Sequence, residues 1–297
     1  MLESVIKDLK KRDVEIGENI PMKRIGSIGI GGDARIVIAP KTLEQFVSIL
    51  NYLKNIQIKH KIVGRMTNLL PCDQPYEGVL VRSAGLLGYS LENGILKVNA
   101  GESLPGLSSK LSRIGLGGLE ELSGIPGTLG GAVVGNAGAF GREIADLVES
   151  VTVLDQSSGK VTVLSNSDLS FGYRHSALKG SGLILLSAKL RLYSADPGVL
   201  TERIHRFRNE RSIKQPKEPS VGSVFKRCGE HAASKLIDSC GLKGRRIGGA
   251  EISSVHAGFI VNKGGATAED FKKLAILCEA EVYKRYGIRL EREVEYL

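Results

Sequence analysis

The chain has 297 residues, of which 42% are hydrophobic and 25% are charged, and its formal net charge is +9. This composition is typical of a soluble globular protein with room for two or three domains. The first residues, MLESVIKDLKKRDVE, are charged throughout, and no apolar run is long enough for a membrane span. We therefore expect a cytoplasmic protein that has no secretory signal and does not insert into a membrane.

The charge and the cysteines narrow the possible partners. The positive charge favours acidic partners, although it could equally serve solubility alone. Aromatic residues make up only 5%, tryptophan is absent, and there is no helix-turn-helix or RNP pattern. We therefore expect no nucleic acid, and an anionic metabolite explains the charge equally well. The cysteines, at positions 72, 228, 240 and 278, form no CxxC pair, which predicts reduced thiols and no metal site.

The first part of the chain predicts a βαβ unit. A short surface helix over 3–15 precedes the apolar, β-branched stretch 34–39, which predicts a strand stopped by a proline. Thr42 then has the position of a helix N-cap, with Gln45 as its capping-box partner. A second strand, 61–64, follows that helix and ends in the turn Gly64–Asn68. α/β folds place ligands at such turns, although a purely structural turn explains this one equally well.

The remaining elements follow in chain order. Strands are expected over 78–82, 95–100 and 183–192, a helix over 104–114, and a hairpin over 151–164 around Gln-Ser-Ser-Gly. A basic helix over about 197–213 marks a domain boundary. A helix that ends at Gly241, a strand over 258–261, and a helix capped by Thr267 and closed by Gly287 come next. The chain ends in a strand over 288–296, whose alternation predicts that its glutamates share one face.

The most unusual stretch is the glycine-rich segment, which we define as Gly115–Gly141. Ten of its 27 residues are glycine, and it has no lysine, arginine or histidine. It has too few side chains for an ordinary amphipathic helix, but it can expose backbone to a ligand. Its apolar residues, Phe140 among them, predict that it packs as an ordered wall around a flat or phosphorylated ligand. The alternative of a flexible linker is less consistent with them. The segment is neither a P-loop nor a Rossmann fingerprint.

Five motifs in order resemble one family, the UDP-N-acetylenolpyruvoylglucosamine reductases. They are Gly124-Ile-Pro-Gly-Thr-Leu-Gly-Gly-Ala with Asn136-Ala-Gly-Ala, Tyr173-Arg-His-Ser, Gly222-Ser-Val-Phe-Lys, Ile247-Gly-Gly-Ala and Leu290-Glu-Arg-Glu-Val. The resemblance implies a mixed α+β and α/β protein with an FAD-binding fold of the PCMH/VAO type. That fold has two subdomains, over 1–80 and 81–205, and an α+β substrate-binding domain follows over 206–297. In an alternative division of the chain, its last strand belongs to the FAD-binding domain instead of the substrate-binding domain.

The resemblance also implies the site residues. The catalytic trio falls on Arg174, Ser223 and Glu293. Substrate contacts fall on Tyr173, Lys226, Arg227 and His256. Non-covalent FAD is held by two segments, Gly64, Arg65, Thr67, Asn68 and Leu69 in the first, and Gly124, Ile125, Pro126, Gly127, Thr128, Gly130, Gly131, Asn136 and Ala137 in the second. From local sequence alone, Arg174 could equally be a surface arginine, and a structural histidine is the default interpretation of His256.

The implied reaction is a two-step hydride transfer in cytoplasmic peptidoglycan synthesis, and so in cell-wall biogenesis, cell shape and cell division. NADPH reduces FAD, which reduces UDP-N-acetylglucosamine enolpyruvate to UDP-N-acetylmuramate. Arg174 stabilises the developing negative charge, Ser223 donates a proton as general acid, and Glu293 assists by hydrogen bonding. We expect a monomer.

The sequence departs from the family pattern at a few positions. Met66 stands where glycine is usual, Val134-Gly135 replaces a bulkier pair, and Arg227 replaces an asparagine of some members. The absence of a long insertion after Tyr173 resembles the shorter subtype, which lacks the substrate-capping tyrosine loop. Two other classes stay open: a flavin oxidase of the same fold, and a nucleotide-binding module without catalysis.

Overall fold

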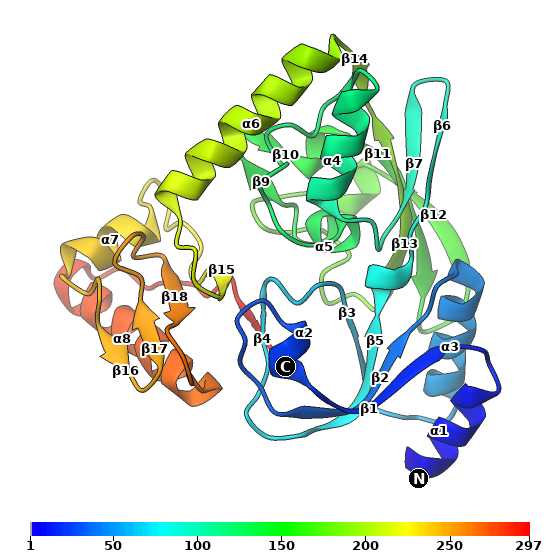
Figure 1. Cartoon of the computed structure of the whole chain (residues 1–297), viewed down its shortest axis with the longest axis horizontal. Coiled ribbons are helices and arrows are strands. Elements are labelled where there is room, and N and C mark those ends of the chain that lie inside the picture. Colours follow the sequence, from blue (N-terminus) through cyan, green and yellow to red (C-terminus); the bar gives the residue numbers. More distant parts are fainter. Residues whose placement is uncertain (1) are drawn as a thin grey trace. The chain divides into compact units, whose positions relative to one another are not determined.

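The structure is a computed structural model that describes residues 2–297 (Figure 1). Its chain divides into two compact units. Unit 1 holds the chain up to Glu18, together with Ile36–Arg65 and Gly78–Glu210. Unit 2 holds Asn19–Arg35, Met66–Glu77 and Arg211–Leu297. None of the helices in residues 2–297 has the length and apolarity that a bilayer crossing requires.

Unit 1 contains a five-stranded antiparallel sheet in the order β12-β11-β13-β7-β6. Its strands are β6 (Tyr89–Glu92), β7 (Ile95–Asn99), β11 (Val148–Asp155), β12 (Val161–Ser165) and β13 (Leu183–Arg191). The helices α4 (Leu104–Arg113) and α5 (Leu129–Val134) contribute buried leucines and valines to the core on this sheet. The predicted hairpin is confirmed, because β11 and β12 pair directly.

A second sheet has the order β1-β2-β5-β3. Its strands are β1 (Glu15–Pro21), β2 (Asp33–Ala39), β3 (His60–Val63) and β5 (Tyr76–Arg82). In unit 1, the helices α1 (Leu2–Lys10) and α3 (Leu43–Asn55) share a core with Ile36 and Ile38 of β2 and with β5. The strand that follows α3 pairs in parallel with β5, which lies between β2 and β3 in the predicted βαβ unit.

Unit 2 is a four-stranded antiparallel sheet covered by helices, in the order β15-β18-β17-β16. Its strands are β15 (Ser220–Ser223), β16 (Arg246–Ile247), β17 (Ala250–Ile252) and β18 (Phe259–Asn262). The helices α7 (Ala233–Ser239) and α8 (Ala268–Tyr286) close its core. The last strand, β19 (Glu295–Tyr296), pairs in parallel with β4 (Leu69–Leu70), which begins at the last residue of the first predicted flavin segment.

The remaining elements are one long helix and several short strands and turns. The long helix α6 (Pro197–Lys214) agrees closely with the predicted helix over about 197–213. The small strands and helices are α2 (Met22–Ile25), β8 (Leu116–Gly117), β9 (Gly138–Ala139), β10 (Arg142–Glu143), β14 (Tyr193–Ser194) and the 3₁₀ turns Ser83–Gly85, Ile144–Asp146 and Ser167–Leu169.

The predicted caps are confirmed where their signals are local. Thr267 Oγ1 accepts the N–H of Asp270 at 3.0 Å, Asp270 returns a bond to the Thr267 N–H, and Gly287 ends α8 at φ 68°. At α3, Thr42 Oγ1 accepts the Gln45 N–H at 3.1 Å. The Gln45 side chain, however, accepts from the N–H of Lys41 rather than from Thr42, so the capping box is shifted by one residue.

Two expectations were wrong. Only Glu295–Tyr296 of the predicted strand 288–296 is a regular strand; before it, Arg292 forms an isolated antiparallel bridge with Phe225, where Lys226 N–H donates to Glu291 O at 2.8 Å. Phe140 does not pack inside and is 40% exposed, although its ring lies 4.7 Å from that of Phe207. The expectation that the glycine-rich segment forms no ordinary amphipathic helix is confirmed, because its helix, α5, is short and buried.

Candidate active site

The second predicted flavin segment combines exposed backbone with an anchored helix start. Gly124–Gly127 and Gly131 are partly or fully exposed, whereas Thr128–Gly130 is buried. The first amide groups of α5 are used internally: Leu129 N–H donates to Glu102 O, Gly130 N–H to Ala100 O, and Gly131 N–H to Thr128 Oγ1. The first N–H groups of α5 therefore already have acceptors within the protein. The surface open to a ligand is the backbone around Gly124–Gly127, which carries few side chains.

The first and second predicted flavin segments meet at Gly64 and Thr128, both in unit 1. A Cβ on Gly64 would lie 2.8 Å from Thr128 Oγ1 and 3.4 Å from Thr128 Cγ2, so only glycine permits this approach. Arg65 follows and is exposed. Met66 adopts φ 52° with its side chain only 4% exposed. That left-handed backbone explains why glycine suits the position, and the buried thioether explains how methionine is tolerated.

Asn136 and Arg174 lie on neighbouring turns of unit 1. Asn136 is fully buried, its amide nitrogen donates to Glu143 Oε2 at 2.7 Å and Gly172 O at 2.9 Å, and its oxygen accepts from Ala145 N–H. All of these contacts are within the protein, so the Asn136 side chain holds the turn that carries Arg174. Glu143 was missed at the sequence level, because only its position seven residues after Asn136 could have indicated it.

Arg174 sits in a strained tight turn. The backbones of Gly172 and His175 bond to each other in both directions at 3.1 Å, so Tyr173 and Arg174 form the tip of the turn. Arg174 adopts φ 54°, a conformation that is uncommon for an arginine and typical of functional sites. Its Nη2 donates to Gly138 O at 3.2 Å, and its guanidinium lies 5.2 Å from the Tyr173 ring centroid. The guanidinium is thus held beside the second flavin segment.

Ser223 and Glu293 are brought together in unit 2. Glu293 N–H donates to the carbonyl of Val224, the residue after Ser223, at 2.8 Å. Asn68 Nδ2 donates to Glu293 O at 3.1 Å. Gly222, with φ 81° at an irregularity in the β15–β18 register, directs the chain into this arrangement. The structure therefore gathers residues from the first flavin segment, the serine motif and the carboxyl terminus, while Arg174 belongs to unit 1.

The predicted substrate residues of unit 2 have distinct environments. Lys226 Nζ donates to Glu291 Oε1 at 2.5 Å, and Arg227 donates to Glu230 O at 3.0 Å. His256 Nδ1 accepts the Gly258 N–H at 3.2 Å, which leaves the ring proton on Nε2. Burial lowers the pKa of His256, so the ring is a neutral hydrogen-bond donor near pH 7.

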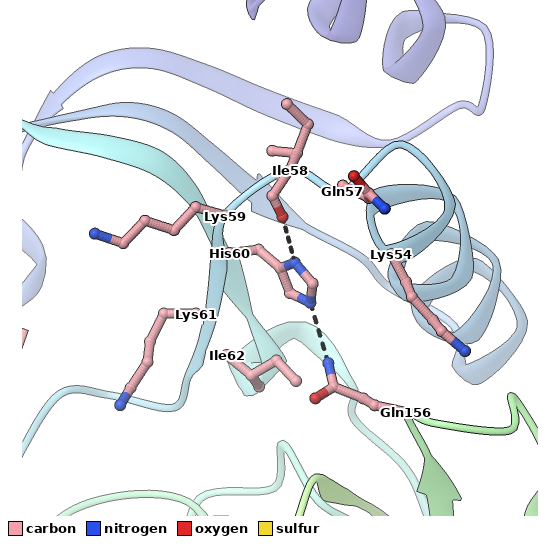
Figure 2. A pocket seen from close by; sticks show the side chains of 8 residues that line it. All are labelled: Lys54, Gln57, Ile58, Lys59, His60, Lys61, Ile62 and Gln156. Atoms are coloured by element: carbon pink, nitrogen blue, oxygen red, sulfur yellow. Dashed lines mark hydrogen bonds between the residues drawn. The ribbon is translucent and has the colours of Figure 1, made fainter.

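A surface hollow beside β3 contains none of the predicted site residues (Figure 2). It is lined by basic and polar side chains, including Lys54, Lys59 and Lys61. His60 lies between the carbonyl of Ile58, 2.8 Å from Nδ1, and the amide of Gln156, 3.0 Å from Nε2. Because both ring nitrogens have partners, the hollow presents no poised acid or base.

The exposed glycine backbone, the buried side chains beneath it and the adjacent arginine fit a flat, phosphorylated cofactor. Residues 34–165 match the FAD-binding domain family, and residues 215–297 match the family described as UDP-N-acetylenolpyruvoylglucosamine reductase, C-terminal domain. The fold and site are thus those of a flavoprotein oxidoreductase with an FAD-binding part and a C-terminal α+β domain, which confirms the predicted fold class.

Several relatives resemble the chain over nearly its whole length. It is 40% identical over 292 residues to the UDP-N-acetylenolpyruvoylglucosamine reductase of Caldicellulosiruptor bescii, covering 97% of this chain and 93% of that protein. The reductase of Synechococcus sp. RCC307 is 39% identical, with coverages of 95% and 94%. The crystal structure of the Thermus caldophilus reductase superimposes with a TM-score of 0.80 at 33% identity, covering 95% of this chain and 98% of that one. The chain belongs to the UDP-N-acetylenolpyruvoylglucosamine reductase family.

Proposed function

We propose that the chain reduces UDP-N-acetylglucosamine enolpyruvate to UDP-N-acetylmuramate, with FAD as cofactor and NADPH as co-substrate. The observation that carries this proposal is the 40% identity to a named reductase over 97% of the chain. The aligned region includes the matched C-terminal domain, in which Glu293 N–H donates to the carbonyl of Val224, the residue after Ser223. When bound, FAD would supply the hydride for the enolpyruvyl double bond, with NADPH as the source of that hydride.

Two segments would hold FAD. The exposed backbone of Gly124–Gly127 offers a surface that a flat ring or a diphosphate can approach closely. Gly64 closes the site from the first segment against Thr128. Asn136 would act indirectly, by fixing the turn that carries Arg174. The other predicted cofactor residues, namely Arg65, Thr67, Asn68, Leu69, Gly130, Gly131 and Ala137, complete this proposal.

Arg174 would stabilise the negative charge that develops on the substrate carboxylate. A guanidinium stays protonated and binds a carboxylate with two parallel hydrogen bonds. Its strained turn and its bond to Gly138 O aim it before substrate arrives, so little reorganisation remains for the reaction. Loss of a preorganised donor of this kind typically costs about 3–4 kcal/mol of transition-state stabilisation.

Ser223 would protonate the substrate carbon, and Glu293 would orient the serine or the proton it delivers. The serine hydroxyl is a weak acid, so it can act only on a strongly basic developing carbanion. Tyr173, Lys226, Arg227 and His256 would bind the sugar nucleotide. The Lys226 ammonium, already paired with Glu291, would contribute charge to that end of the site.

The biological setting and organisation remain part of the proposal. We propose that the enzyme acts in peptidoglycan precursor synthesis in the cytoplasm and that it is a monomer. The domain limits proposed from the sequence, near residues 80 and 205, would separate the two FAD subdomains from the substrate domain.

The test is NADPH oxidation by the purified yellow protein, followed at 340 nm without oxygen. Oxidation should require the enolpyruvyl sugar nucleotide, and the flavin should be released by acid or heat. Rapid flavin reoxidation by oxygen with an alcohol or sugar as reductant would instead indicate an oxidase.

The role of Ser223 is tested by following the two half-reactions separately through flavin absorbance. Ser223→Ala should leave flavin reduction by NADPH nearly intact and slow reoxidation by the enolpyruvyl substrate by about 10²–10⁴-fold. Ser223→Cys should retain more activity, because a thiol can still give a proton. Ser239→Ala, at an exposed end of α7, is the matched control. A Ser223→Ala variant that is impaired in flavin reduction but not in reoxidation would contradict the assignment.

A further inference from the structure

The residues just before the flavin segment form an unusually polar buried stretch, Glu120–Ser123. The Glu120 and Glu121 side chains are 2% and 11% exposed, and Ser123 is 1% exposed. None of these side chains belongs to a predicted binding or catalytic set. Their position matters because Gly124 follows Ser123 directly, so the placement of this stretch sets the placement of Gly124–Gly127.

Arg203 of α6 holds the first half of this stretch. Its Nη2 donates to Glu121 Oε1 at 2.6 Å, and its Nη1 donates to Tyr193 Oη at 2.9 Å. Tyr193 in turn donates to Glu120 Oε1 at 2.6 Å. The other Glu120 oxygen accepts the Gly118 N–H at 2.6 Å. Two carboxylates are thereby tied to one helix residue that lies more than eighty positions away in the sequence.

Arg208, five residues further along α6, holds the second half. Its Nε donates to the carbonyl of Ser123 at 3.2 Å, and its Nη2 donates to Pro105 O and Ser109 Oγ at 2.8 Å each. These acceptors are neutral, and burial lowers the pKa of the guanidinium. Burying a guanidinium charge among neutral acceptors costs free energy. The hydrogen bonds of Arg208 therefore fix the position of the segments it joins, which those of an ordinary surface arginine would not do.

Two buried atoms of the stretch have no hydrogen-bond partner within residues 2–297: Glu121 Oε2 and Ser123 Oγ. A buried polar atom without a partner costs about 1–3 kcal/mol. Both atoms are closed off from solvent, so they do not face an open ligand surface. Their cost is tolerated because the surrounding bonds, from Arg203 and Arg208, determine where this backbone runs.

We propose that α6 positions the flavin segment: Arg203 and Arg208 are positioning residues that hold Glu120–Ser123, and through it Gly124–Gly127, in the shape that FAD binds. The inference rests on the proposed assignment of Gly124–Gly127 to the flavin site. Arg208 makes the sharper test, because one side chain joins the carbonyl of Ser123 to the start of α4.

The experiment measures the affinity of the apoprotein for FAD by flavin fluorescence, well below the unfolding temperature of each apoprotein. Arg208→Met keeps the aliphatic stem and removes the donors, and it should raise the Kd for FAD at least tenfold. The Kd of Arg208→Lys should lie between those of Arg208→Met and the wild type, since one ammonium group cannot reproduce all the hydrogen bonds of the guanidinium. Arg206→Met, an exposed arginine on the same helix, should leave the Kd within twofold.

Further measurements separate positioning from general stability and from direct contact. The KM for the sugar nucleotide at saturating FAD should change less than threefold in Arg208→Met, because the defect lies in cofactor binding. Ser123→Ala should leave the Kd for FAD unchanged and the apoprotein at least as stable, since its hydroxyl has no partner.

Unchanged FAD binding in Arg208→Met, or equal weakening in Arg206→Met, would overturn the inference. A tenfold loss in Ser123→Ala would also overturn it, because it would indicate direct contact with the flavin. If the folded wild-type protein itself bound no FAD, the proposed function would fail instead, whatever the behaviour of the α6 variants.

Discussion

Gly64→Ala is expected to weaken FAD binding through a collision with Thr128. The new Cβ would lie 2.8 Å from Thr128 Oγ1, and the backbone of Gly64 is outside the left-handed region, so the penalty is steric rather than conformational. Overpacking of this kind costs about 1–3 kcal/mol. Without the flavin, the two segments can relax apart. With the flavin both are held, so the cost appears as a Kd raised by about 5- to 150-fold.

A double-mutant cycle tests the stated cause. Thr128→Ala removes the two closest atoms and leaves only the Thr128 Cβ, at an ordinary 3.7 Å. That substitution has its own cost of about 1 kcal/mol, because Thr128 caps α5. Gly64→Ala should then cost much less in the Thr128→Ala background, which gives a coupling free energy of about 1–3 kcal/mol in the FAD affinities.

The control is Gly106→Ala on α4, where the nearest atom to the new Cβ lies 3.3 Å away on the side chain of Ser103. It should bind FAD like the wild type. Two results would refute the reasoning: wild-type affinity in Gly64→Ala, or a penalty that is the same with and without the Thr128 side chain.

Three further predictions address single residues. Arg227→Ala should raise the KM for the sugar nucleotide more than it lowers kcat, and an unchanged KM would remove Arg227 from the site. Met66→Gly should be net destabilising by about 0–4 kcal/mol in urea unfolding, because about 2–5 kcal/mol of buried side-chain packing is lost and only about 1–2 kcal/mol of left-handed strain is relieved. A stabilised variant would reverse that ranking. Burial lowers the pKa of His256, so the unfolded state binds its proton first, and stability is lost as the pH falls from about 6.5 towards the lowered pKa. His256→Gln should flatten this loss between pH 7.5 and 5.5 in urea unfolding, whereas the exposed His205→Gln should not.

The sequence by itself determined the elements whose signals lie within a few residues. Thr267 begins and Gly287 ends α8 as predicted, because a helix cap depends only on residues in the adjacent turn. The Gln-Ser-Ser-Gly turn between two apolar stretches was enough for the β11–β12 hairpin. The five motifs were likewise readable in order, and they led to the correct family and cofactor.

Only the tertiary structure decided the contacts between distant segments. Asn136 uses its amide on Glu143 and Gly172, and Arg208 reaches Ser123 from 85 positions away. The alternation over 288–296 predicts one continuous strand, yet residues 291–294 form only an isolated antiparallel bridge with residues 224–226. Likewise, Asp73 accepts the N–H groups of Ala268 and Glu269 at the start of α8. Local sequence sets the conformational preference of each segment, but the partner of a buried polar group depends on the path of the whole chain, because many segments could satisfy it equally well.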